Sequence, residues 1–82
     1  MWADVIITNE THNRVWSLIQ QYARLCQHTP LEVTHAVLSS KTLRKHGYTH
    51  EQRGSLTEDQ GRAAVRVLDY WIGRHLEQHQ QG

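Results

Sequence analysis

Apolar residues recur every three or four positions over two long stretches of this chain, residues 9–27 and 57–78. The first stripe contains Val15, Leu18, Ile19, Tyr22, Leu25 and Cys26, and the second contains Ala64, Val65, Leu68, Trp71, Ile72 and Leu76. This spacing lines up apolar side chains on one face of an α-helix. Two such helices have to bury their stripes together, so the pattern predicts a helical bundle.

The segment "TPLE" predicts the start of a further helix between the two long ones. Thr29 is placed to cap the helix, Pro30 stands at the first helical position, and Glu32 can reach back to the cap. The serines at 39–40 compete for backbone hydrogen bonds, so the helix either breaks there or continues to His46.

Glycine and threonine mark the next boundaries. Gly47 is expected in the left-handed conformation that ends a helix, with Tyr48 folding back onto the last turn. After a polar loop at 49–55, Thr57 is the expected cap of the last helix, with Gln60 at its third position.

We therefore expect one domain of class all-α, a compact three- to four-helix bundle with an extended N-terminal arm. The 82 residues suffice for a single small core. Residues 1–8 form the arm, because their β-branched residues prefer extended backbone but have no evident partner strand. Residues 9–78 form the helical domain, and the polar residues 79–82 form a frayed tail.

Composition and charge narrow the class of protein. Hydrophobic residues make up 38% of the chain and its formal net charge is +1, which indicates a globular domain without a global positive field. The single cysteine excludes an intramolecular disulfide and suits a reducing compartment. We find no secretory signal and no membrane-spanning apolar run, so a cytoplasmic location without membrane contact is expected.

The seven histidines raise the question of a metal site. His75 and His79 have the spacing that would let both face one ion, but structural zinc needs about four ligands and no further ligand stands beside them. Cys26, with His28 or His35 nearby, lies on the buried stripe, where a thiol is inert. We therefore expect no metal, no cofactor and no catalytic residue.

The strongest local charge is a basic segment at 41–53. Its candidate nucleic-acid-binding residues are Lys41, Arg44, Lys45 and Arg53. On a helix the first three share one face, where they could neutralise phosphates. A helix, a two-serine corner and a basic helix also have the outline of a helix-turn-helix, although the corner lacks a glycine.

Three tryptophans are more than one small core easily buries, which points to a surface for a protein partner or a second copy of the chain. Aromatic and arginine side chains anchor such interfaces. The candidate partner-binding residues are Trp16, Ala63, Val67 and Tyr70, with Arg62 and Arg66 beside them.

Two segments, "IITNETHNRVWSLIQ" and "SLTEDQGRAAVRVLDYW", carry a resemblance that spans Ile6 to Trp71. Their layout resembles the small C-terminal modules of phage antirepressors and phage single-strand annealing proteins. The resemblance implies a phage or mobile-element module, not an enzyme, that docks onto a protein partner in DNA metabolism or its regulation. The alternative is a direct DNA-binding regulator that uses the basic segment.

Overall fold

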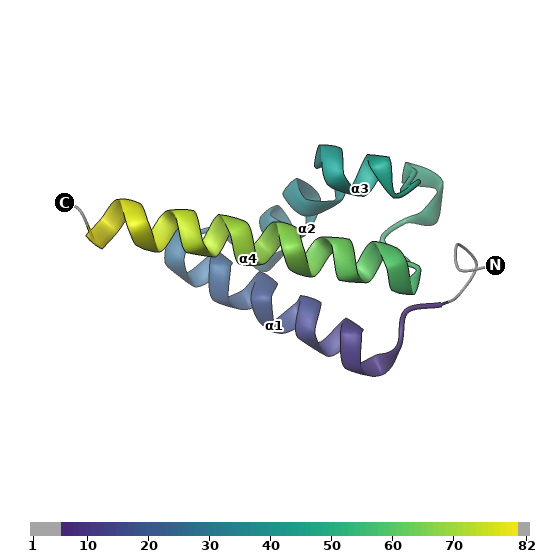
Figure 1. The fold of residues 1–82 in the computed structure, drawn as a ribbon, viewed down its shortest axis with the longest axis horizontal. Coiled ribbons are helices and arrows are strands. Elements are labelled where there is room, and N and C mark those ends of the chain that lie inside the picture. Colours follow the sequence, from purple (N-terminus) through teal and green to yellow (C-terminus); the bar gives the residue numbers. More distant parts are fainter. Residues whose placement is uncertain (1–5, 81–82) are drawn as a thin grey trace.

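The computed structural model describes the backbone of residues 6–80 and the side chains of residues 6–78. This part of the chain contains four α-helices, α1 (Asn9–Cys26), α2 (Pro30–Leu38), α3 (Lys41–Lys45) and α4 (Glu58–Gln80), and a short 3₁₀ turn at His50–Gln52 (Figure 1). The expected all-α bundle is confirmed. The predicted tail begins inside α4, and residues 81–82 lie outside the described residues, as do residues 1–5 of the arm.

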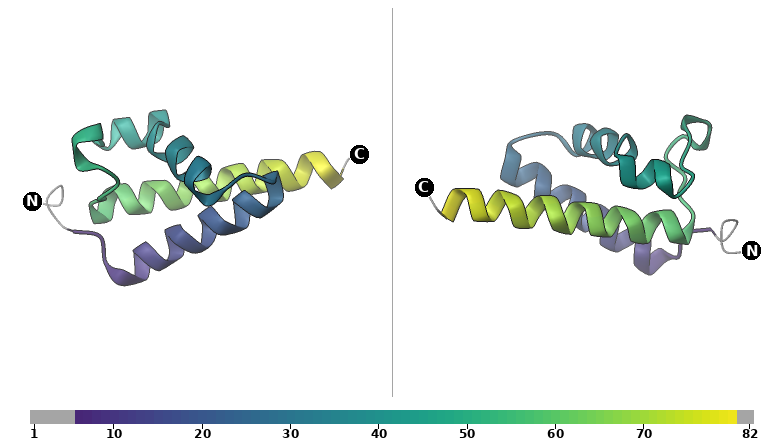
Figure 2. Two further views of the ribbon diagram at one scale, coloured as in Figure 1. Left: turned by 180° about the vertical axis from the view of Figure 1, so that it is seen from behind. Right: turned by 45° about the horizontal axis from the view of Figure 1, so that its top comes forward.

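The two long helices lie side by side and run in the same direction (Figure 1). Between them the chain returns through α2 and α3, which form a second layer over one side of the α1–α4 pair (Figure 2). Helix α2 contacts both long helices, whereas α3 contacts α2 and α4. Because the long helices are parallel, their N-terminal ends lie together at one end of the bundle.

The helix boundaries follow the local signals. The capping box of Thr29 and Glu32 is present, with Pro30 in the first turn. The helix breaks at the two serines, because the Ser40 hydroxyl accepts a hydrogen bond from the backbone N–H of Leu43 and so caps a new helix, α3. Continuation of α2 to His46, the other alternative, does not occur.

The chain leaves α3 through a tight turn. Gly47 has a φ of +83°, the left-handed conformation expected for it. Tyr48 then packs into the core with 7% of its surface exposed, and its hydroxyl accepts a hydrogen bond from the N–H of Gly54. This contact ties the loop after α3 back onto the bundle.

The core runs between the two layers and draws on every α-helix. Its buried side chains are Val15, Ile19, Ala23, Val33, Val37, Leu43, Tyr48, Ala63, Ala64, Val67, Leu68 and Ile72. Ala63 and Val67 are only 1% and 7% exposed, so their assignment to a partner-binding surface was wrong. They are buried because α2 and α3 both pack on α4 in addition to α1.

The described part of the N-terminal arm has a partner that was not expected from the sequence. Ile6 forms an isolated antiparallel bridge with Thr57, and the N–H of Ile7 donates to the carbonyl of Leu56 over 3.2 Å. Ile7 also packs on Gly61, where a Cβ would lie 2.5 Å from the Ile7 Cδ1 atom. The absence of a side chain at Gly61 therefore lets the arm lie close to α4.

Glu58, in the first turn of α4, joins the N-terminal ends of both long helices. Its carboxylate accepts hydrogen bonds from the Thr11 hydroxyl over 2.6 Å and from the Thr8 N–H over 2.9 Å. The Arg62 Nε–H donates to it as well, over 3.0 Å. These donors, Thr11 first and the Thr8 N–H next, lower the pKa of Glu58 from its ordinary value of 4.5 to about 2.

The low pKa of Glu58 predicts a specific dependence of stability on pH. Because the folded pKa is below the unfolded one, the contribution of Glu58 is complete above about pH 4.5 and is lost as the pH falls toward about 2. The difference in the free energy of unfolding between wild type and Glu58→Gln should therefore shrink between neutral pH and about pH 3 in urea titrations.

The matched control for this pH dependence is Glu10→Gln. Glu10 also lies in the first turn of its helix, but it is exposed and forms no side-chain hydrogen bond among the described residues. A Glu10→Gln difference that changes with pH as much as the Glu58→Gln difference would contradict the assignment to Glu58.

Within residues 6–80, none of the helices has both the length and the apolar character needed to cross a membrane.

Candidate partner-binding groove

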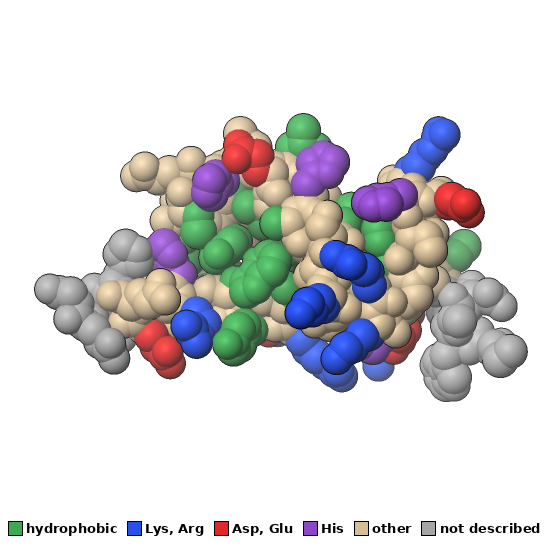
Figure 3. All heavy atoms as spheres, turned by 90° about the horizontal axis from the view of Figure 1, so that it is seen from above, with side chains coloured by type: hydrophobic (Ala, Val, Ile, Leu, Met, Phe, Trp, Pro, Cys, Tyr) green, Lys and Arg blue, Asp and Glu red, His purple; other side chains and the backbone are tan. Residues whose placement is uncertain are grey.

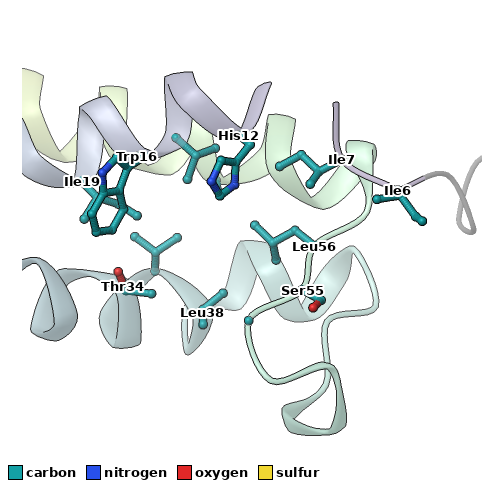
Figure 4. Close-up of a pocket in the computed structure, with 13 residues that line it drawn as sticks. Ile6, Ile7, His12, Trp16, Ile19, Thr34, Leu38, Ser55 and Leu56 are labelled. Carbon is teal, nitrogen blue, oxygen red and sulfur yellow. The ribbon is translucent and has the colours of Figure 1, made fainter. Parts of the chain in front are cut away.

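An apolar groove of about 390 Å³ opens between α1 and the second layer, close to the arm (Figure 4). Helix α1 and the end of α2 form its walls, and Ala64 of α4 lies at its floor. The lining residues are Ile6, Ile7, His12, Val15, Trp16, Ile19, Thr34, Val37, Leu38, Gly54, Ser55, Leu56 and Ala64. This volume is within the usual range of ligand pockets, and the apolar lining is typical of them.

The groove exists because the second layer is shorter than the first. Helix α2 has nine residues and α3 has five, against eighteen in α1. Helix α3 packs on α2 and α4 and makes no contact with α1 among the described elements. The N-terminal half of α1 therefore packs on α4 but has no helix of the second layer above it, and side chains of the loop before α4 close only the end of the gap.

Trp16 forms one end of the groove. Its indole ring points from α1 toward Thr34 of α2, while Ile6 lies at the opposite end (Figure 4). Trp16 is 46% exposed and Ile6 is 81% exposed, although both are large and apolar. Exposed apolar side chains that gather around a hollow are typical of interaction sites, whereas single ones are ordinary.

The wall formed by Ser55 and Leu56 is held in place by Gln60, which is 4% exposed. The Gln60 side chain accepts from the Thr57 N–H over 3.1 Å and donates to the His46 carbonyl over 3.1 Å. It also exchanges hydrogen bonds with the amide of Gln52, over 2.7 and 3.3 Å. The loop is thus anchored to α4 by one buried amide, and the groove is largely preformed.

The basic segment lies next to this groove. Lys and Arg side chains gather over the half of the upper face that carries α3 (Figure 3). Lys41, Arg44, Lys45 and Arg53 are exposed, and none of them forms an ion pair with a described carboxylate. Arg44 donates only to the backbone carbonyl of Ser39, over 3.3 Å.

Several carboxylates among the described residues already form ion pairs. The ion pairs within residues 6–78 are Arg14–Asp69, His28–Glu32, His46–Asp59 and Arg62–Glu58. Lys41, Arg44, Lys45 and Arg53 are thus left without an ion-pair partner among the described residues, although the net charge of the chain is only +1 and the exposed Glu51 lies in the same segment.

The structure does not bring the six predicted partner-binding residues into one surface. Tyr70 is 62% exposed but lines a different hollow, with Tyr22, Trp71 and Arg74. Arg62 is engaged with Glu58, whereas Arg66 is exposed without an ion pair among the described residues. Of the six, only Trp16 lines the groove.

Cys26 lies near the C-terminal half of α4 rather than at the groove. Its Sγ is 3.8 Å from the Nδ1 atom of His75, beside the ring of Tyr22. Burial, and then the contact with Cys26, raises the pKa of Tyr22. No group of three or more His, Cys, Asp or Glu side chains within the described residues could hold a metal ion. The side chain of His79 is not among those described.

The sequence did not predict most of the groove, because the residues that line it belong to no single pattern. Leu38 stands at the end of α2, Leu56 stands just before the Thr57 cap, and His12 is polar. The one usable signal was Trp16, an aromatic residue a third of a turn away from the buried stripe of its helix.

No family model, no curated protein and no solved structure matches this chain. Any assignment of function therefore rests on the chain's own geometry and sequence.

Proposed function

We propose that this chain is a small protein-binding module whose groove receives apolar side chains from a segment of a partner. The observation that supports it is the preformed apolar groove with the half-exposed Trp16 at one end. Tryptophan is enriched at the centre of protein interfaces, where it contributes a large contact area at small entropic cost. His12, Thr34 and Ser55 supply the few polar groups that would orient the bound segment.

The resemblance to phage modules suggests where the partner belongs. A phage or mobile-element module of this kind would dock onto a protein of DNA metabolism or its regulation. In this proposal the chain acts by binding and not by catalysis, and it would bring its partner to a complex rather than alter the partner chemically.

Direct DNA binding is the second candidate, and it is favoured by the four cations at 41–53, which form no ion pair within residues 6–78. However, α3 has only five residues, which is too short for a recognition helix that inserts along the major groove. In this alternative the basic side chains would contact the DNA phosphates rather than the bases. A salt-sensitive mobility shift that disappears in Lys41→Ala/Arg44→Ala would make this the leading function.

The groove is tested by selecting peptides from a random display library on the folded protein and measuring their affinity by fluorescence anisotropy. Trp16→Ala should weaken the selected peptides by about 30-fold, the effect of losing an interface hot spot of roughly 2 kcal/mol. Thr34→Arg, which puts a long charged side chain at the mouth of the groove, should abolish binding.

Leu31→Ala and Tyr70→Ala are the matched controls, because both residues are large, exposed and outside the groove. Circular dichroism checks that each variant stays folded. Peptides that bind Thr34→Arg as well as wild type, or that depend on Tyr70 rather than Trp16, would refute the groove as the binding site.

A further inference from the structure

The groove does not end at Leu38, because a second hollow adjoins it there. This hollow, of about 340 Å³, is lined by Leu38, Ser39, Arg44, Tyr48, Thr49 and His50. Leu38 lines both spaces, so the two hollows adjoin at this side chain. The first part is apolar, whereas the second combines an arginine and a histidine with hydroxyl groups.

Among the described residues, the one formal charge that lines these two hollows is positive and belongs to Arg44. No carboxylate lines either hollow, while His12 lines the first and Arg44 and His50 line the second. Arg53 is exposed directly before Gly54, a residue of the groove wall. The nearby Glu51 is exposed and lines neither hollow.

From this arrangement we infer that the groove's partner is an acidic linear segment, in which apolar side chains stand next to carboxylates. The apolar side chains occupy the groove between Trp16 and Leu38, and the neighbouring carboxylates face Arg44 and Arg53. This inference rests on the proposed function and names the chemistry of its partner. Complementary charge at the rim speeds association and selects among partners, while the apolar contacts supply most of the affinity.

A nucleic acid fits the same surface less well. Its phosphates would match Arg44 and Arg53, but the groove lining is mainly aliphatic. Among the described residues Trp16 is its one Trp, Tyr or Phe side chain, and Tyr48 of the second hollow is only 7% exposed. Single-stranded nucleic acids are held by several aromatic platforms along a basic channel. Aliphatic walls instead suit leucine-, isoleucine- or phenylalanine-like side chains.

The test compares the peptide pools that wild type and Arg44→Gln/Arg53→Gln select from the same random library. The wild-type pool should combine apolar anchors with adjacent aspartate or glutamate, and the variant's pool should keep the anchors but lose the acids. A selected acidic peptide should bind wild type about tenfold more tightly at low salt than its Asn/Gln counterpart. Physiological or higher salt should narrow that ratio.

Arg24→Gln/Arg66→Gln is the matched control, because both arginines are exposed, line neither hollow and, unlike Arg53, do not directly precede or follow a residue that lines one. It should leave the preference for acidic peptides unchanged. Pools with apolar anchors but no acidic preference would overturn this inference and leave the proposed function standing. If the selected peptides bind Trp16→Ala and Thr34→Arg as tightly as wild type, both this inference and the proposed function are wrong. A short single-stranded oligonucleotide provides a last comparison. If it displaces the acidic peptide, binds more tightly than the peptide and loses affinity in Arg44→Gln/Arg53→Gln, the two arginines bind nucleic acid instead.

Discussion

Replacement of Leu68 by alanine should lower the free energy of unfolding by about 3 kcal/mol. Leu68 is fully buried in α4 and belongs to the core that joins the two layers. The substitution removes the transfer free energy of the side chain and leaves a cavity that the helices only partly fill. Since a domain of 82 residues has a total stability of about 4–12 kcal/mol, this is a large fraction.

Urea denaturation followed by circular dichroism measures this effect. Leu31→Ala is the matched control, because Leu31 is 67% exposed on α2 and its loss should cost less than about 1 kcal/mol. If Leu68→Ala does not fold, Leu68→Val should still give a smaller loss of about 1 kcal/mol. Equal losses for Leu68→Ala and Leu31→Ala would contradict the packing described for α4.

Replacement of Gln60 by methionine should lower the free energy of unfolding by about 2–3 kcal/mol. Methionine preserves the length of the side chain but neither donates nor accepts a comparable hydrogen bond. The Thr57 N–H, the His46 carbonyl and the Gln52 amide would then lose their partner in a part-buried site. Buried polar groups left without partners cost more than the net value of the bonds they had formed.

Gln60→Met also has a consequence for binding, because Gln60 holds the loop that carries Ser55 and Leu56. Affinity for a groove-selected peptide should fall in this variant even under conditions where it is fully folded. Gln78→Met is the control, since Gln78 is an exposed glutamine of the same helix. A Gln60→Met protein as stable as Gln78→Met would show that the network contributes nothing to the fold.

The helices could be predicted from the sequence because their signals are local. A capping box, a proline in the first turn and a left-handed glycine act within a few residues of one another. The Thr29 cap, the Gly47 turn and the Thr57 cap accordingly lie where they were expected. The two serines left an alternative open, because a hydroxyl can either interrupt a helix or start the next one.

The wrong predictions from the sequence concern which side of a helix faces solvent. Ala63 and Val67 form a second apolar line on α4, and periodicity alone does not say whether another helix covers it. The packing of the second layer on α4 buries Ala63 and Val67 in the core, while Tyr70 further along the same line is exposed. For the same reason, the predicted partner-binding residues do not share one surface, and only Trp16 among them lines the groove.

Most helix boundaries and the main apolar stripe of each long helix were already specified by short-range spacing, since a helix turn repeats every 3.6 residues whatever lies around it. Short-range spacing did not specify the groove, because the groove is a gap between elements of unequal length. It depends on α3 packing against α4 and not α1, on the pairing of Ile6 with Thr57, and on the buried amide of Gln60. These contacts join residues far apart in the chain, so only packing in three dimensions creates the surface on which the proposed function rests.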